Sequence, residues 1–244
     1  MAFMDVATRA LPIKANGTRP LGDCLLGMPL FEGVEAAVIE RIAAAANEFD
    51  APGGSVIFKQ GDACRGLYIV VAGQVKLALG VTQGDEQVVE LAGPGRILGE
   101  TAMFLDGPHI LTAEALDDTR LAYVSRTTVM AELERTPEFA RCIIAALSHR
   151  LQRLMAALED CTLRSGTERV IGYLLNRLPT DASDGRAMVT LPAKKGVIAS
   201  QLNLTHEHFS RILRSLAVEA MIEVDGRTVH IRDMARMRLY SLKP

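Results

Sequence analysis

The spacing of apolar and polar residues changes several times along the chain. From Leu21 to Glu48, apolar residues recur at helical spacing, most clearly over residues 33–42, which predicts short helices. From Phe49 to Ser125, short apolar runs alternate with glycine turns, which is typical of antiparallel strands. Glycine suits such turns because it adopts a positive φ without a steric penalty. An antiparallel barrel or jelly roll is therefore expected here. The expected strands are residues 56–58, 67–71, 74–79, 88–91 and 121–124.

A single long helix is predicted from Pro137 to Arg164, because proline is tolerated in the first turn and neither glycine nor proline follows. Apolar residues along it alternate at spacings of three and four, which forms the a/d seam of a coiled coil. Such a narrow stripe fits a two-helix coiled coil better than packing on the protein's own barrel, the alternative. In a parallel pair Cys161 would face its twin, where an interchain disulfide is conceivable. The seam consists of Ile144, Leu147, Leu151, Leu154, Leu158 and Cys161.

The C-terminal stretch from Thr167 to Pro244 has the pattern of a winged helix. A helix is expected from Glu168 to Leu178, then a short strand from Met188 to Leu191. Two further helices, residues 195–202 and 206–219, precede an Asp225-Gly226 hairpin. Two helices alone would also fit an ordinary αα-hairpin, but a hairpin directly after them favours a DNA-binding module.

The second of these helices has the two faces that a recognition helix needs. Thr205 is a good N-cap. Phe209, Ile212, Leu213 and Leu216 form an apolar face, and polar side chains occupy the opposite face near the N-terminus. In the major groove, Arg can pair with guanine, Glu can accept from cytosine, and Ser can contact several base edges. The expected DNA contacts are Thr205, His206, Glu207, His208, Ser210, Arg211, Arg214, Arg227, Lys194 and Lys195.

Charge supports this assignment. The chain has 244 residues and a net charge of −2, but from Leu163 onward 13 Lys and Arg stand against 8 Asp and Glu. A basic C-terminal third on an acidic body suggests a module that binds a polyanion. Arg227, beside the expected hairpin tip, is placed to meet a phosphate, which adds affinity without sequence choice.

From Leu21 to Asp233 the chain resembles the Crp/Fnr family of bacterial transcription regulators. The resemblance rests on the glycine pattern with Gly99-Glu100, the long helix, and the stretch from Ile198 to Leu216. It implies an α+β fold with an N-terminal antiparallel β-roll (a cyclic-nucleotide-binding-like jelly roll), a long dimerisation helix and a C-terminal winged helix-turn-helix. The expected divisions are a flexible arm (1–20), a sensor domain (21–130), the dimerisation helix (131–164) and the DNA-binding domain (165–244).

The resemblance also implies a function. The Fnr-type motif E-x-x-S-R stands here as Glu207-His208-Phe209-Ser210-Arg211. A homodimer should therefore read a palindrome similar to TTGAT-N4-ATCAA, with base contacts from Glu207, Ser210 and Arg211. Double-stranded DNA, a second copy of the chain and RNA polymerase are the expected partners. With no signal peptide and no apolar run of the ~18 residues that read as a membrane span, the expected location is the cytoplasm, with no membrane partner.

The effector is where the chain departs from better-known members. Cyclic-AMP binders follow Gly-Glu by an Arg that meets the phosphate, but Ile110-Leu111-Thr112 stands in that place here, and no Lys or Arg lies between Arg96 and Arg120. Since a buried phosphate without a cation is costly, cyclic AMP is not expected. An iron–sulfur cluster is not expected either, because it needs four converging thiolates and only Cys24 lies near the N-terminus.

The remaining resemblance is to the subgroup that regulates dissimilatory nitrate respiration, thought to sense nitric oxide through haem. Haem is thus the leading effector hypothesis, with His109 and His149 as candidate axial ligands. Each of these histidines also fits a plain surface or packing role. The expected effector pocket comprises Gly99, Glu100, Met103, Phe104, His109, Leu111, Leu154 and Met155.

An enzyme is not expected, because a metal oxygenase in such a barrel needs clustered histidines, and residues 49–125 contain only His109. A small organic effector, or a DNA binder whose sensor domain is empty, stays open, because a pocket and a filled core look alike in sequence.

Overall fold

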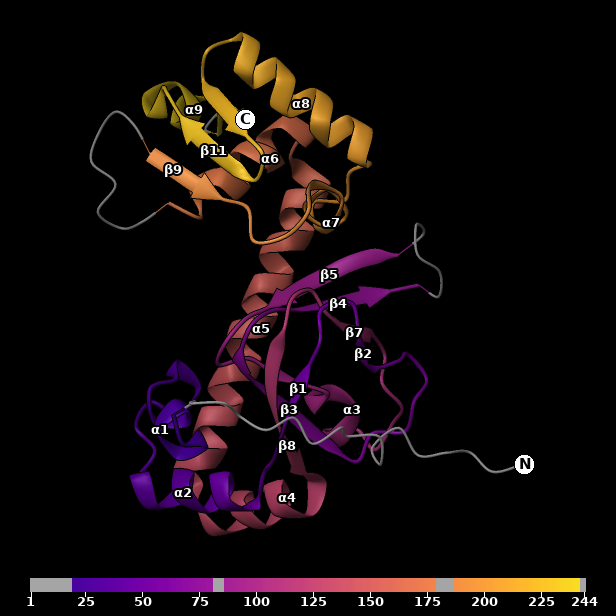
Figure 1. Ribbon diagram of the computed structural model, residues 1–244, viewed down its shortest axis with the longest axis vertical. Helices are drawn as coiled ribbons and strands as arrows, with labels where there is room; N and C mark the ends of the chain where they lie inside the picture. The colour runs from indigo at the N-terminus through magenta and orange to yellow at the C-terminus, as the bar shows by residue number, and fades with distance from the viewer. Residues whose placement is uncertain (1–18, 81–85, 179–186, 242–244) are drawn as a thin grey trace. The chain divides into compact units, whose positions relative to one another are not determined.

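The computed structural model describes residues 19–80, 86–178 and 187–241 (Figure 1). The chain divides into two compact units, residues 1–151 and 152–244. The boundary falls inside the longest described helix, α5 (Pro137–Leu163), and each unit is described by itself. Within the described ranges, no helix is long and apolar enough to cross a membrane.

The first unit is built around two four-stranded antiparallel sheets. Their strand orders are β1-β8-β3-β6 and β2-β7-β4-β5. Val70 and Leu121 from the first sheet and Val75 and Ala113 from the second are fully buried in one cluster, so the core lies between the sheets. The strands are β1 (Asn47–Ala51), β2 (Val56–Phe58), β3 (Gly66–Ala72), β4 (Val75–Leu79), β5 (Gln87–Ala92), β6 (Ile97–Leu98), β7 (Thr112–Ala115) and β8 (Thr119–Ser125).

Two glycines permit the close approach of β3 to β8. A Cβ on Gly66 would lie 2.3 Å from the carbonyl oxygen of Val124, nearer than any real contact. Gly73 has a φ of +82°, and a Cβ there would lie 2.6 Å from Oγ1 of Thr119. Any other residue at these two positions would push the paired strands apart.

A helical layer covers the outer face of the first sheet (Figure 1). Leu67 and Ile69 of β3 pack there with Ile39, Val129 and Phe139 from three different helices. The start of α5 is thereby anchored to the first unit through buried apolar side chains. The layer consists of α1 (Leu21–Leu26), the 3-10 helix η2 (Pro29–Phe31), α2 (Ala36–Ala45), α4 (Arg126–Arg135) and the first turns of α5.

The second unit packs helices against a small antiparallel sheet of order β10-β11-β9. Its core includes the fully buried side chains of Ile171, Ile198, Phe209 and Leu216. Its elements after α5 are α6 (Gly166–Leu175), β9 (Ala187–Thr190), α7 (Lys195–Gln201), α8 (His206–Val218), β10 (Ile222–Asp225), β11 (Thr228–Ile231) and α9 (Met234–Ser241).

The predicted fold class is confirmed, and the differences are local. The long helix begins at Pro137 as expected, but residues 131–135, assigned to it in the expected domain ranges, belong to α4. Thr136 is extended between the two helices because a following proline disfavours the helical conformation. The stretch expected to be helical up to Glu48 ends earlier, since β1 starts at Asn47. Six elements were not predicted: β1, β6, β7, the short helix α3 (Glu100–Phe104), α4 and α9.

Candidate nucleic-acid interface

A helix-turn-helix is formed by α7 and α8. Asn203 in the turn has a φ of +54°, a left-handed conformation that the short polar side chain of asparagine tolerates. Thr205 is the N-cap of α8, and its Oγ1 accepts a hydrogen bond from the backbone N–H of His208 at 3.2 Å. The helix therefore starts where the sequence predicted, because one of its otherwise unpaired N–H groups is satisfied.

The apolar face of α8 fixes its orientation in the second unit. Phe209, Ile212, Leu213 and Leu216 are all buried, at the spacing of three, one and three residues predicted from the sequence. One side of the helix faces the core, so the opposite side must face solvent. The residues on that opposite side decide what the helix can bind.

The solvent side of α8 is polar and carries the predicted contact residues. Glu207, Arg211 and Arg214 are exposed, and Ser210 is half-buried beside them. They lie within the first three turns, the part of a recognition helix that reaches base edges. A carboxylate, a hydroxyl and guanidinium groups thus share one face, with both acceptors and donors for hydrogen bonds.

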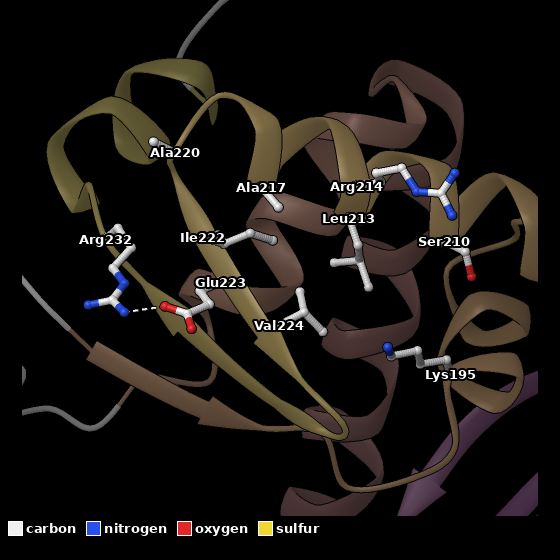
Figure 2. A pocket seen from close by; sticks show the side chains of 10 residues that line it. All are labelled: Lys195, Ser210, Leu213, Arg214, Ala217, Ala220, Ile222, Glu223, Val224 and Arg232. Atoms are coloured by element: carbon white, nitrogen blue, oxygen red, sulfur yellow. Dashed lines mark hydrogen bonds and ion pairs between the residues drawn. The ribbon is translucent and has the colours of Figure 1, made fainter.

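A groove of about 750 Å³ lies between α8, the N-terminus of α7 and β10 (Figure 2). Leu213, Ile222 and Val224 contribute apolar side chains to it, and Lys195 and Arg214 contribute cationic ones. A concave surface with cations beside a recognition helix is suited to a phosphodiester backbone, which positions a protein on DNA without reading sequence.

One end of this groove is lined by a pair that the sequence analysis missed. Glu223 on β10 forms an ion pair with Arg232, which follows β11 (Figure 2). Both side chains are at least partly exposed, so the pair contributes little to stability. Strand register places the two residues near each other, because Ile222 pairs with Ile231. The alternation of the hairpin sequence could have indicated this pair.

The hairpin itself differs by one residue from the prediction. Asp225 pairs with Thr228, so the two central turn residues are Gly226 and Arg227 rather than Asp225 and Gly226. Gly226 has a φ of +56°, and glycine in the first central position is what a type II′ turn requires. Arg227 is therefore at the tip itself, and it is exposed.

The remaining predicted DNA contacts flank this surface. Lys194 is the N-cap residue of α7 and is exposed. His206, the first residue of α8, is exposed and lies 3.9 Å from where a Cβ on Gly196 of α7 would stand. His208 lies on the other flank: its Cε1 is 3.3 Å from where a Cβ on Gly166 would stand, so it packs on the start of α6.

In the first unit, the predicted effector residues do not form one cluster. Gly99 and His109 are adjacent, since a Cβ on Gly99 would lie 3.0 Å from Cε1 of His109. Met103 belongs to the core under the helical layer, with Phe104 partly buried against it, whereas Leu111 belongs to the core between the sheets. Leu154 and Met155 are exposed residues of the second unit.

His109 is a packed side chain. Its ring stacks on Phe58 with centroids 3.8 Å apart, and it is only 5% exposed. Burial lowers the pKa of the imidazole below its usual value, with Asp62 opposing the shift. His149, the other candidate ligand, is exposed on α5. Within the described ranges, no three or more His, Cys, Asp or Glu side chains are grouped so that they could hold a metal ion.

A second charged cluster was also missed from the sequence. Arg150 of α5 forms ion pairs with Glu90 of β5 and with Glu100, the first residue of α3. The expectation that no cation lies near Gly99-Glu100 rests on the residues between Arg96 and Arg120 alone. A cation on the helix was overlooked because it is about fifty residues away in the sequence.

The predicted dimer seam on α5 is free of intramolecular cover over most of its length. Ile144, Leu151 and Leu158 are each at least 60% exposed, and Leu154 and Cys161 are also exposed. Leu147 is the exception, because it packs partly against the core of the first unit. All four cysteines of the chain are free thiols.

Comparison with known proteins agrees with both units. Residues 49–136 match the model of the cyclic nucleotide-binding domain, and residues 168–240 match that of the Crp-like helix-turn-helix domain. The nitrogen fixation regulation protein FixK of Azorhizobium caulinodans is 32% identical over 190 residues, which cover 75% of each chain. The chain belongs to the Crp/Fnr family. It is therefore a DNA-binding transcription regulator.

Other Crp/Fnr proteins extend the similarity over most of the chain. The cyclic AMP receptor protein of Thermus thermophilus is 28% identical over 209 residues, covering 86% of this chain and 94% of the relative. The structure of FixK2 from Bradyrhizobium japonicum superimposes with a TM-score of 0.69 at 26% identity, covering 82% of this chain and 98% of that one. The FixK relative from Azorhizobium caulinodans is a nitrogen fixation regulation protein, which favours a regulator over an enzyme for this Crp/Fnr chain.

We expect the cap of α8 to be needed for the stability of the DNA-binding unit of this Crp/Fnr protein. Thr205→Ala should lower the free energy of unfolding by about 1 kcal/mol, because the N–H of His208 loses its acceptor. Thr205→Ser, which keeps the hydroxyl, should stay close to wild type. Urea denaturation followed by circular dichroism measures both, and equal loss in the two variants would contradict the capping role.

Proposed function

We propose that this regulator acts as a homodimer that reads a palindrome similar to TTGAT-N4-ATCAA through α8. The observation that supports it is the single polar face of Glu207, Ser210 and Arg211, accessible on the side of α8 opposite its buried face. Arg211 can donate two hydrogen bonds to guanine, and Glu207 can accept from a cytosine amino group. Each half-site of the proposed palindrome contains one G·C pair, which offers both of these groups.

The cations around this face would position the protein without choosing sequence. Lys195 and Arg214 line the groove beside α8, and Arg227 stands at the tip of the wing. In our proposal they bind phosphates on either side of the bases that α8 reads. Lys194 would add to the same field, whereas His208 is assigned to packing.

Dimerisation is proposed through α5. Exposed Ile144, Leu151 and Leu158 leave a row of apolar side chains in water, and burying it against a second copy removes that cost. A dimer with two recognition helices separated by one DNA turn, ~34 Å, reads a palindrome. RNA polymerase is a further proposed partner, because the protein is a transcription regulator.

Two effectors are candidates for the first unit, a cyclic nucleotide and haem. Relatives named as cyclic AMP receptors make a cyclic nucleotide one candidate, but no Lys or Arg that could meet its phosphate lies between Arg96 and Arg120. Haem is the second candidate, and the observation in its favour is the buried imidazole of His109, whose pKa is lowered by burial. The stacking of that ring on Phe58 does not fit a ligand that reaches iron, unless the loop around it rearranges.

Arg211→Ala should abolish the preference for the palindrome over a scrambled duplex. The loss expected for one bidentate pair is about 1–3 kcal/mol for each half-site, while salt-sensitive nonspecific binding should persist. Fluorescence anisotropy with both duplexes at two salt concentrations measures this. Arg141→Ala, which removes an exposed arginine from α5, is the matched control. An Arg211→Ala protein that still discriminates would contradict the assignment of α8.

The double variant Leu151→Asp with Leu158→Asp should be monomeric, because two carboxylates would be buried in the proposed seam. Sedimentation equilibrium measures the mass. Ala145→Asp with Ala156→Asp adds the same charge to exposed positions on a different face of α5, and this protein should stay dimeric. A seam variant with unchanged dimer mass would place the interface elsewhere.

The haem hypothesis predicts a Soret band when haem is added to protein purified without air, and a shift of that band with nitric oxide. If His109 is the ligand, the band should be lost in His109→Ala and kept in His149→Ala. An ultraviolet–visible titration decides this. A protein that takes up no haem would remove the hypothesis and leave the DNA-binding proposal intact.

A further inference from the structure

The groove beside α8 differs in charge between its two ends (Figure 2). At one end, Lys195 and Arg214 lie beside Ser210, and neither cation forms an ion pair with a described residue. At the other end, Arg232 is paired with Glu223. Among the described residues that line the groove, Glu223 is the only one with a carboxylate. One end therefore carries two positive charges without a paired acid, and the other end has no net charge.

The wing hairpin places this acid in the groove. Glu223 lies on β10 opposite His230, and Arg232 is the first residue after β11. The Nη2 atom of Arg232 donates a hydrogen bond to Oε2 of Glu223. This hydrogen bond and the positive charge of Arg232 lower the pKa of the carboxyl below its usual value. Glu223 is therefore ionised at neutral pH, when DNA is bound.

The effect of the pair on a DNA strand comes mainly from charge. The side chains of Arg232 and Glu223 are 42% and 58% exposed, and an exposed ion pair holds its partners only weakly. Arg232 attracts a nearby phosphate, but the carboxylate beside it repels the same phosphate. Lys195 and Arg214 are not paired in this way among the described residues. A strand in the groove is therefore attracted mainly to their end.

We propose that Glu223 attenuates DNA binding: it cancels the charge of Arg232 and keeps this end of the groove from binding a phosphate of the DNA strand. The inference rests on the proposed function, in which Lys195 and Arg214 bind phosphates of that strand. A phosphate contact adds affinity without reading sequence. Glu223 therefore lowers the affinity for every duplex by the same factor, and the choice of sequence stays with the polar face of α8.

The test measures how the binding of full-length protein depends on salt, by fluorescence anisotropy with the palindrome and with a scrambled duplex. In Glu223→Gln, Arg232 is released to bind a phosphate. We expect tighter binding to both duplexes at an unchanged ratio, and a slope of log K against log salt that is steeper by about 0.9 for each protomer. The gain in affinity should therefore shrink by about 3.5-fold for each protomer when salt is raised from about 50 to about 200 mM.

Two further variants show whether the gain depends on Arg232. Glu223→Gln with Arg232→Gln should return the slope and the affinity close to wild type, because no cation is released. Arg232→Gln alone should bind both duplexes more weakly at an unchanged slope, because the carboxylate is left without its cation. A slope that is shallower by about 0.9 in Arg232→Gln and unchanged in Glu223→Gln would show that Arg232 already binds a phosphate, which would overturn the proposal.

Glu219→Gln is the matched control. Glu219 is also an exposed carboxylate paired with an arginine, since its Oε2 lies 3.1 Å from Nη2 of Arg236, but it is not among the residues that line the groove. Its removal changes the net charge of the protein by the same amount as Glu223→Gln. We expect the slope and the affinity of this variant to match wild type. A gain equal to that of Glu223→Gln would reduce the effect to net charge and overturn the role assigned to Glu223.

The two duplexes separate this inference from the proposed half-site. Equal affinity of wild type for the palindrome and the scrambled duplex would show that the half-site is wrong. The slope of Glu223→Gln on the scrambled duplex would still decide the role of Glu223, because phosphate contacts do not depend on sequence. An unchanged slope in Glu223→Gln on both duplexes would overturn the attenuation and leave base reading by α8 intact.

Discussion

Helix α5 carries two apolar surfaces that both have to be covered: one packs on the first unit, and the other is exposed. Near its start, Phe139 and Ile143 are buried against the first unit, where Phe139 stacks on Phe31. Further along, Ile144, Leu151 and Leu158 face solvent. A helix with only the first surface would belong to the roll, and one with only the second would be a free coiled-coil strand. Helix α5 carries both: its start packs on the first unit, and its exposed apolar row is the seam that we propose for the dimer.

In the DNA-binding unit, apolar burial likewise decides which side of α8 is exposed. Because Phe209 and Leu216 are held in the core, the polar side of α8 cannot turn away from solvent. The cap at Thr205 fixes where the helix starts, which determines which residues lie in its first turns. The base recognition that we propose for Glu207 and Arg211 thus depends on apolar burial on the other side of the helix. The groove toward β10 adds cations without altering that division.

Features that depend on local periodicity could be predicted from the sequence, and features that depend on tertiary contact could not. The helical periodicity of α5 and α8 and the N-cap at Thr205 are local, and the predictions of both helices and of the cap were confirmed. The hairpin was predicted but not its exact turn, because both Asp225 and Gly226 fit a two-residue loop and only the pairing of Asp225 with Thr228 decides. Short α3 has too few residues for a periodic signal.

The charged cluster around Glu100 also depends on tertiary contacts, so the sequence alone does not predict it. The sequence shows Gly99-Glu100 and the lack of a nearby cation, and from these facts an empty or apolar site follows. That inference treats neighbours in sequence as neighbours in space. Arg150 lies on α5, which packs against the roll. It forms ion pairs with both Glu100 and Glu90, so the buried Glu100 is paired with a cation that is distant in sequence.

The ion pairs of Arg150 favour one position of α5 on the roll, although buried ion pairs are weak evidence for stability. Desolvating Arg150, Glu90 and Glu100 consumes most of their mutual attraction, so the folded state gains little from the pair overall. Conformations that separate the charges, however, lose the attraction without recovering full hydration while Glu100 stays buried. The pair therefore discriminates between positions of α5 more strongly than it stabilises the fold.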